Sequence, residues 1–515
     1  MKLTLETLER WLWDSADLMR GHIDSSDFKN YIFGLLFLKR ANDQFFEEAN
    51  LAVQEEGISL DEALEDEDYH QFFIPKAAYW NELTKKTENI GQALDKAFAA
   101  IEEINPQLEG VMTAVHFGDS EKLPDNLLSR LLQHFNKYSL ANADLENPDI
   151  LGNAYEYLIR EFAGDAGKAG GEFYTPKEVV KLVVGLIKPE AGNSIYDPTC
   201  GSGGMLIESA HYIKEHGGVV DKYINASLFG QEKNLGTWAI AKINMIVHNF
   251  IDSDIRKGDT LAHPQHTENG ELMTFDRVIA NPPFSLKKWW APAEVDIKTD
   301  EKGKEIAPKY NDVVTDEYGR FKYGIPPRGY GDLAFVQHMI AVLKQNGRMG
   351  VVLPHGILFR GGTEGKIRKG ILEDDLIEAI VGLPEKLFYN TGIPASILII
   401  NKNKPERLKN KVVFIDASSE YKDGKNQNTL TEENIKKVID AYDGLTDIDK
   451  FMRIVDMGEI RENDYNLNIA RYIDTSEPEA IVDIKAVLSE IVELEAKEKA
   501  IDEELNGYLK ELGFK

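Results

Sequence analysis

Hydrophobic residues recur at intervals of three and four through the first 150 positions of the chain. The segments Asp27–Ala41 (DFKNYIFGLLFLKRA) and Asn126–Tyr138 show this spacing most clearly. It predicts helices with one buried face, and strand-like alternation is scarce in this region. No set of catalytic side chains stands out here. We therefore expect residues 1–150 to form a packed helical domain, with contact to a partner or to DNA as the lesser alternative.

The pattern changes from about residue 170, where short β-rich runs alternate with helical stretches. The predicted strands are Ser194–Asp197, Ser227–Gln231, Arg277–Ala280, Met349–Leu353, Ile377–Leu383, Ser396–Asn401 and Val412–Ile415. Helical segments Gly203–His216 and Leu235–His248 fall between the first three strands. Strand–helix–strand alternation predicts a parallel sheet with helices on both faces. Such sheets bind ligands at the carboxyl ends of their strands, which is where candidate chemistry is expected.

Two further segments lie outside this alternation. The residues between Phe284 and Asp332 form a long insertion without clear periodicity, and such a loop is usually functional or disordered. Among the residues that it carries are Lys287, Lys288, Trp289, Trp290, Lys302, Lys304, Arg320, Lys322 and Arg328. Ala480–Leu512 reads as a charged amphipathic helix whose apolar seam suits either a partner helix or its own domain. The predicted domains are residues 1–150, 151–473 and 474–515.

Charge changes this picture. Acidic residues number 87 and basic residues 59, which gives a net charge of -28. Proteins that grip DNA unaided usually neutralise several phosphates with clustered cations. Because the chain is so acidic, either its substrate is not nucleic acid, or a partner supplies most of the affinity for DNA.

Two absences from the sequence limit the class of protein. Cys200 is the single cysteine, so neither an intrachain disulfide nor a thiolate zinc cluster is possible. The N-terminus has no apolar signal region, and no apolar run approaches the ~20 residues needed to span a bilayer. We expect a soluble cytoplasmic protein with no membrane partner.

A glycine-rich turn, Asp197-Pro-Thr-Cys-Gly-Ser-Gly-Gly204, follows the first predicted strand and precedes a helix. Glycines let the backbone approach a ligand closely, and the N–H groups at a helix start favour a carboxylate or phosphate. Nucleotide, flavin or methyl-donor binding would all fit this turn. The lysine that a P-loop places before Ser or Thr is missing, which disfavours phosphoryl transfer.

Two further acids follow at successive strand ends. Glu232 could accept hydrogen bonds from both ribose hydroxyls of a nucleoside. Asp259 could accept one from an adenine amino group. Together with Asp197 they suit an adenosine ligand, although each alone is more often a turn or cap residue.

Asn281-Pro-Pro-Phe284 directly follows the apolar strand that ends at Ala280. Because the two prolines have no N–H donors, the Asn281 side-chain oxygen and the Pro282 carbonyl become paired acceptors. Such a pair suits an amino group on an aromatic ring, and accepting both N–H hydrogens favours a pyramidal nitrogen whose lone pair can attack a sulfonium methyl. Phe284 would stack on a target base swung out of the duplex. Catalysis would rest on positioning and electrostatics without metal or covalent nucleophile, and the alternative is a rigid loop.

Three motifs taken in order resemble a known family. Gly171-Glu-Phe-Tyr-Thr-Pro176, the glycine turn and Asn-Pro-Pro-Phe together are similar to the gamma-type adenine-N6 methyltransferases. The helical N-terminal region and the stretches 331–340, 347–360 and Asn463–Tyr472 resemble the modification subunits of type I restriction–modification systems. The resemblance covers nearly the whole chain, and its motifs are specific in combination.

The resemblance implies a fold and a set of site residues. The fold class is α/β, a Rossmann-like S-adenosylmethionine-dependent methyltransferase sheet preceded by an all-α domain and followed by a C-terminal amphipathic helix. The implied residues along the methionine moiety of the donor are Glu172, Phe173, Tyr174, Thr175, Pro176 and Lys177, with the Thr175 hydroxyl near its carboxylate. Those forming the methionine and ribose floor are Asp197, Gly201, Ser202, Gly203 and Gly204. Glu232 would hold the ribose and Asp259 the adenine, while the catalytic residues would be Asn281, Pro282, Pro283 and Phe284. Cys200 is interpreted as a packing residue, and no metal site is implied.

The resemblance also implies partners that resolve the charge conflict. Type I modification subunits act on double-stranded DNA with a specificity subunit that reads the sequence, a second modification subunit and an endonuclease subunit, and their methylation protects host DNA. The terminal helix could then pack on the specificity subunit. The basic insertion, with Arg360, Lys366, Arg368 and Lys369, could contact phosphates.

Two alternatives remain at this point. A protein-glutamine methyltransferase could use an Asn-Pro-Pro-aromatic turn to hold a side-chain amide, although the Phe-Tyr-Thr-Pro segment is unexpected there. A degenerate methyltransferase fold could act only as a scaffold, although the intact motifs argue against it.

Overall fold

The computed structural model describes residues 2–24, 27–147, 149–165, 174–220, 223–290, 298–299, 305–306, 314–388, 392–425, 427–475 and 484–514. The chain divides into two compact units, Met1–Ile473 and Asp474–Lys515. The predicted donor residues Glu172 and Phe173, and Lys302 and Lys304 of the insertion, lie outside the described residues.

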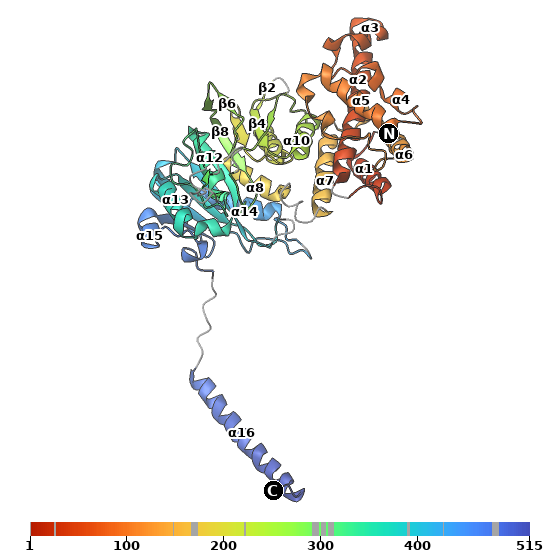
Figure 1. Cartoon of the computed structure of the whole chain (residues 1–515). Coiled ribbons are helices and arrows are strands. Elements are labelled where there is room, and N and C mark those ends of the chain that lie inside the picture. Colours follow the sequence, from red (N-terminus) through yellow and green to blue (C-terminus); the bar gives the residue numbers. More distant parts are fainter. Residues whose placement is uncertain are drawn as a thin grey trace. The chain divides into compact units, whose positions relative to one another are not determined.

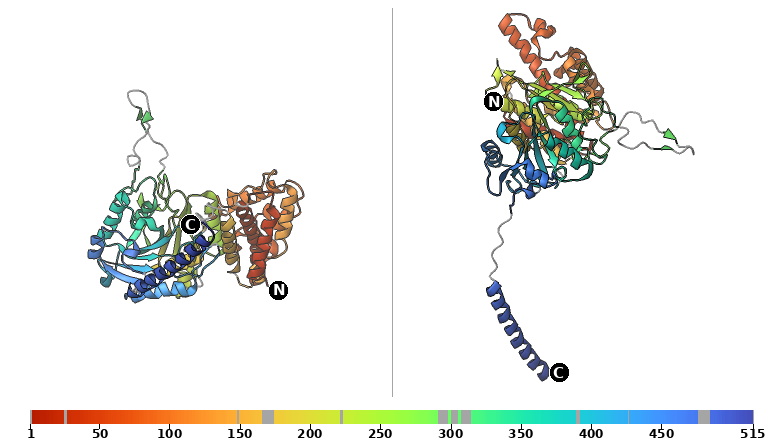
Figure 2. Two further views of the ribbon diagram at one scale, coloured as in Figure 1. Left: turned by 90° about the horizontal axis from the view of Figure 1, so that it is seen from below. Right: turned by 90° about the vertical axis from the view of Figure 1, so that its left-hand side faces the viewer.

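The N-terminal region is helical, as its periodicity predicted (Figure 1). Its α-helices are α1 (Leu5–Met19), α2 (Phe28–Glu56), α3 (Leu60–Glu65), α4 (Trp80–Leu83), α5 (Ile90–Ile104), α6 (Asp125–Phe135) and α7 (Ile150–Asp165). Pro124 is the N-cap of α6, where its fixed φ angle suits a helix start. Helix α10 (Leu235–Val247) of the following region packs on both α2 and α7. The red and orange helices therefore lie beside the sheet domain within one unit (Figure 2).

The central sheet has nine strands among the described residues, in the order β15-β14-β12-β13-β11-β8-β1-β4-β5. Their bounds are β1 (Ser194–Asp197), β4 (Ser227–Glu232), β5 (Asp254–Lys257), β8 (Phe275–Ala280), β11 (Leu343–Pro354), β12 (Ile377–Gly382), β13 (Ala395–Asn401), β14 (Lys411–Asp416) and β15 (Met452–Asp456). Three two-stranded ribbons are formed by β2 (Val219–Val220) with β3 (Tyr223–Ile224), β6 (Thr267–Glu268) with β7 (Glu271–Leu272), and β9 (Lys298–Thr299) with β10 (Glu305–Ile306).

Strand direction is parallel across β11-β8-β1-β4-β5 and between β12 and β14. The prediction of an entirely parallel sheet is wrong for β13, which runs antiparallel to both neighbours, and β15 is antiparallel to β14. Residues 383–394 connect β12 to β13, and no helix is described among them, whereas a parallel crossover usually contains one. Every residue of β13 is buried, and a continuous apolar run carries no information about direction.

Helices cover both faces of the sheet, as predicted. They are α8 (Lys177–Ile187), α9 (Gly204–Glu215), α10, α12 (Asp332–Ala341), α13 (Gly362–Glu373), α14 (Glu432–Gly444) and α15 (Met457–Glu462). Successive strand residues enter different cores: Ile195 joins the core that includes the N-terminal helices, and Tyr196 joins the core that includes α12 and α13. This alternation follows from the two-residue period of a strand.

The second unit contains α16 (Ile484–Glu511). Its apolar residues are exposed at helical spacing, at Leu488, Ile491, Leu494, Ile501, Leu505 and Tyr508. Across the described part of the chain, no helix is long and apolar enough to cross a bilayer.

Candidate active site

Four predicted side chains meet at one edge of the sheet. Strands β8, β1, β4 and β5 are adjacent and parallel, so their carboxyl ends share that edge. Asp197 ends β1 and Glu232 ends β4. Asn281 follows β8 directly, and Asp259 follows β5 after Gly258. The sheet order thus brings the three acids and the Asn-Pro-Pro-Phe turn together.

The glycine turn is held by its neighbours on both sides. Gly201 and Gly203 have positive φ angles of 55° and 84°, which a residue with a side chain adopts only with strain. The Cys200 backbone N–H donates to the Gln231 carbonyl at 3.0 Å, and the Asn244 side chain donates to the Ser202 carbonyl at 2.8 Å. Burial raises the pKa of the Cys200 thiol, consistent with its interpretation as a packing residue.

Two buried carboxyl groups lie at this turn. Asp197 is 2% exposed, and burial raises its pKa to about 8 despite a hydrogen bond from the Thr199 backbone N–H. Glu232 accepts hydrogen bonds from the Gly201 and Asn234 backbone N–H groups at 3.2 and 2.8 Å, and burial raises its pKa as well. Each group lacks a cationic protein partner among the described residues. A ligand that brings positive charge or hydroxyl donors would stabilise both carboxylates.

Asp259 is more strongly engaged by the protein itself. One of its oxygens accepts hydrogen bonds from the Leu261 and Ala262 backbone N–H groups, at 3.0 and 3.2 Å. The other forms an ion pair with Lys233 at 2.8 Å. Asp259 therefore also stabilises the turn after β5, as its simpler interpretation suggested.

The side-chain amide of Asn281 has a hydrogen-bond partner for its nitrogen but none for its oxygen among the described residues. Its Nδ2 donates to the Thr175 hydroxyl oxygen at 2.9 Å. Its Oδ1 is buried and accepts no hydrogen bond from any described residue. Buried polar atoms almost always find a partner, so an unpaired acceptor at a ligand edge needs an explanation. The sequence analysis expected the Thr175 hydroxyl near the carboxylate of the donor, whereas in the structure this hydroxyl contacts the Asn281 amide.

The rest of the Asn-Pro-Pro-Phe turn is fixed by packing. Phe284 makes an edge-to-face contact with Phe388, with ring centroids 5.6 Å apart. The backbone N–H of Ser285 donates to the buried Asp332 carboxylate at 2.8 Å. Asp332 belongs to the stretch 331–340, and the sequence alone did not indicate this contact.

A cavity of about 800 Å³ opens at this edge. Its lining includes Glu232, Asp259, Asn281 and Pro283. A small hollow nearby is lined by the remaining described donor residues of the predicted segment, together with the glycine turn: Tyr174, Thr175, Lys177, Ser202 and Gly204. Seven of the predicted donor residues therefore line one or the other opening, whereas Asp197, Gly201 and Gly203 line neither. Pro176 is the N-cap of α8.

The helical domain contributes residues that the sequence analysis missed. Asp27, Lys29 and Asn30, before and at the start of α2, line the same cavity. The Asn30 side chain lies opposite Gly236, where an added Cβ would come within 3.9 Å of it. The periodicity of this region identified a helix but gave no signal that its first turn faces a site in another domain.

Two predicted phosphate contacts, Arg320 and Arg368, are corrected by the structure. Arg320 is 3% exposed and donates to the Thr260 and Leu261 carbonyls. Arg368 is 5% exposed and donates to three backbone carbonyls, and Arg360 pairs with Glu364 and lies over the Tyr330 ring. The Arg320 and Arg368 guanidinium groups stabilise the fold instead, whereas the contact by Arg360, whose side chain is 27% exposed, stays a prediction.

Comparison with known proteins agrees with this geometry. Residues 146–480 match the N-6 DNA Methylase family, and residues 8–135 match the HsdM N-terminal domain. A type I restriction enzyme methylase subunit of Methanocaldococcus jannaschii, MjaVII, is 37% identical over 99% of this chain and 85% of its own length. The chain belongs to the N-6 DNA methylase family.

Two further relatives place this methylase within the family. The HindI methylase subunit of Haemophilus influenzae is 34% identical over 76% of this chain and 85% of its own. The crystal structure of a type I restriction–modification methyltransferase subunit from Streptococcus thermophilus has a TM-score of 0.75 and 33% identity. That match covers 92% of this chain and 100% of the other.

The predicted fold class and enzyme class are confirmed. The methylase is an S-adenosylmethionine-dependent adenine-N6 DNA methyltransferase of the type I modification kind. The protein-glutamine methyltransferase and the scaffold alternatives are not favoured.

Proposed function

We propose that this methylase presents adenine N6 of double-stranded DNA to a methyl donor at Asn281-Pro-Pro-Phe284. The observation that carries the proposal is the Asn281 amide, whose nitrogen is held by Thr175 and whose buried oxygen has no partner among the described residues. An amino group entering the cavity would supply the missing donor.

The residues at the carboxyl edge fit S-adenosylmethionine. This donor supplies a methyl group on a positively charged sulfur. Glu232 would accept hydrogen bonds from the ribose hydroxyls, and Asp197 lies buried beside the turn without a cation. Gly201–Gly204 leave the backbone open to close approach, and Tyr174–Lys177 would lie along the methionine end. Asp259 already forms an ion pair with Lys233. It would bind the adenine of the donor through the remaining hydrogen-bond acceptor positions of its carboxylate.

The protein's part in the reaction is orientation and charge. Asn281 Oδ1 and the Pro282 carbonyl would accept the two N6 hydrogens, which directs the nitrogen lone pair towards the methyl carbon. Pro283 stiffens the turn, and Phe284 would stack on the extruded base. As the carbon–nitrogen bond forms and the carbon–sulfur bond breaks, N6 releases one proton to water. No metal enters this scheme, so methylation is expected to persist in a chelator.

The partners follow from charge and from the terminal helix. With a net charge of -28, the methylase would bind duplex DNA weakly by itself. We infer that a specificity subunit recognises the DNA sequence and supplies most of the DNA affinity. A second methylase and an endonuclease subunit would complete a cytoplasmic complex that protects host DNA. The exposed apolar residues of α16 offer that subunit a helix-packing surface.

Co-expression tests this function directly. The chain is expressed alone or with its neighbouring specificity subunit in a host that lacks adenine methylation, and modified adenines are read across the genome. The proposal predicts N6-methyladenine at one sequence motif only when both are present. Methylation of protein glutamine with unmodified DNA would overturn it.

A further inference from the structure

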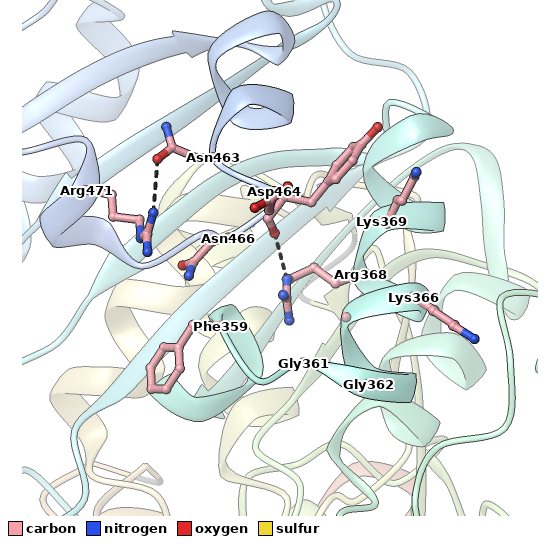
Figure 3. A pocket seen from close by; sticks show the side chains of 12 residues that line it. Phe359, Gly361, Gly362, Lys366, Arg368, Lys369, Asn463, Asp464, Asn466 and Arg471 are labelled. Carbon is pink, nitrogen blue, oxygen red and sulfur yellow. Dashed lines mark hydrogen bonds between the residues drawn. The ribbon is translucent and has the colours of Figure 1, made fainter.

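A second cavity opens on the neighbouring side of the reaction centre. It has a volume of about 390 Å³ and lies between the start of α13 and the segment after α15 (Figure 3). Its lining side chains and glycines include Gly361, Gly362, Lys366, Lys369, Asp464 and Arg471. The active-site account above leaves this cavity without a role.

Position links this cavity to the Asn-Pro-Pro-Phe turn. Strand β11 is the parallel neighbour of β8, and the chain leaves its carboxyl end through the short helix His355–Leu358 before reaching Gly361. Arg360 lies 3.7 Å from the Asp332 carboxylate that holds the Ser285 backbone N–H after Phe284. The cavity therefore lies beside the place where the target base would enter.

The walls of the cavity are fixed. Arg368, on α13, donates through Nε to the Tyr465 carbonyl at 2.9 Å, which ties the two walls together. Leu467 on the second wall donates its backbone N–H to the Leu358 carbonyl at 2.8 Å. The cations are thus presented by a preformed surface.

The charges facing the cavity are mainly positive, in contrast to the chain as a whole. Lys366 has no hydrogen-bond or ion-pair partner among the described residues, and Arg471 donates only to the neutral Asn463 side chain at 3.2 Å. Lys369 lies over the Tyr465 ring and 3.7 Å from Glu373. Asp464 is the one carboxylate in the lining. Cations without carboxylate partners are unexpected in a protein of net charge -28.

The backbone adds hydrogen-bond donors to the same opening. Gly361 is the N-cap of the twelve-residue helix α13 and provides no side-chain cap, so the first N–H groups of the helix remain available. An added Cβ at Gly361 or Gly362 would meet no atom within 4 Å, which shows open space there. Free N–H groups and the positive end of a helix favour a phosphate.

We propose that the cavity between Phe359–Lys369 and Asn463–Arg471 holds a backbone phosphate of the DNA strand that carries the target adenine. This rests on the proposed function of Asn281-Pro-Pro-Phe284 and extends it. Arg471 and the first backbone N–H groups of α13 contact the phosphate oxygens, and Lys366 adds positive charge at the rim. The contact positions the strand while the neighbouring base is extruded.

The salt dependence of DNA binding tests the proposal. In the complex with the specificity subunit, the Lys366→Ala/Arg471→Ala variant is expected to lower DNA affinity by roughly tenfold. The slope of log affinity against log salt should fall by about 0.9 for each phosphate contact removed. Lys436→Ala, which removes an exposed lysine paired with Asp440 on α14, is the matched control and should leave both unchanged. An unchanged slope in the double variant would overturn the proposal.

Two single substitutions separate binding from folding. Gly361→Asp gives α13 a favourable N-cap with no backbone strain, since its φ is -84°, but places a negative charge at the phosphate. It should weaken DNA binding while the melting temperature is kept or raised. Asp464→Asn removes the opposing carboxylate at a positive φ that Asn tolerates and should tighten binding a few-fold. Weakened binding by Asp464→Asn would contradict the proposal.

Donor binding by calorimetry distinguishes this proposal from the proposed function. If the unmodified complex neither binds the donor nor methylates DNA, the proposed function is contradicted. If it methylates normally and the cavity variants have no effect on DNA binding, only the proposed phosphate site is contradicted. Inorganic phosphate that protects the cavity from lysine modification, without any change in the DNA salt slope, would assign the cavity to a free anion and overturn the DNA contact.

Discussion

The two cavities at this sheet edge have opposite charge. The charged residues that line the larger one are Asp27, Glu232, Asp259, Lys29 and Lys233. Its lining also includes Asn281, whose unpaired oxygen is buried. The smaller one is lined by Lys366, Arg368, Lys369 and Arg471 against Asp464. An acidic cavity suits a cationic donor with ribose hydroxyls, and a basic one suits a phosphate. The net charge of the chain therefore hides a local division of binding tasks.

The largest expected effect is on the acidic cavity's reaction centre. Asn281→Ala removes the acceptor for adenine N6 and should lower kcat by about a thousandfold, the scale for one lost transition-state hydrogen bond. Donor affinity should stay within about twofold, because Asn281 contacts the base and not the donor. Single-turnover methylation and calorimetry on the same preparation measure both. A kcat of the Asn281→Ala variant close to that of the unmodified protein would show that Asn281 is not catalytic.

Donor affinity should depend most on Glu232. Glu232→Gln replaces a charged acceptor with a neutral one and should weaken S-adenosylmethionine binding about tenfold or more. Asp259→Asn should have a smaller effect, because the turn and Lys233 already engage that carboxylate. Equal losses in the two variants, measured by calorimetry, would show that Asp259 contributes as much as Glu232.

Thr175 is a positioning residue for Asn281. Thr175→Val removes the hydroxyl that accepts from Asn281 Nδ2 and should lower kcat about tenfold while the KM for the donor changes little. Thr175→Ser should restore kcat, since it keeps the acceptor. A rise in donor KM without a change in kcat would instead support the sequence-based position of Thr175 near the donor carboxylate.

The last expected effect is on stability and not on activity, and it is a pH dependence from Asp197. Burial raises its pKa from 3.8 to about 8, so the folded state binds a proton that the unfolded state releases between these values. This contribution to stability is complete below pH 3.8 and is lost as the pH rises towards 8. Asparagine is a neutral isostere of aspartate. As the pH rises from 5 to 8, the free energy of unfolding of the Asp197→Asn variant, measured with denaturant, should therefore increase relative to that of the unmodified protein. A constant difference would contradict the raised pKa.

The sequence predicted those features that local patterns determine. The strand ends that carry Asp197, Glu232 and Asn281 follow from short apolar runs and a glycine turn, and all three lie at one edge as expected. The reversal of β13 and the burial of Arg320 and Arg368 depend on remote carbonyls and neighbours, which spacing does not encode. The contribution of Asn30 to the cavity depends on how two domains pack. Alternating periodicity describes one element at a time and gives no information about such contacts.

A structure of the complex with duplex DNA and the demethylated donor tests the central claim most directly. The measured quantity is the distance from Asn281 Oδ1 to N6 of the extruded adenine. We predict a hydrogen bond of about 3 Å, with Nδ2 still bound to Thr175. An extruded adenine whose N6 lies away from Asn281, with that oxygen still unpaired, would contradict the account.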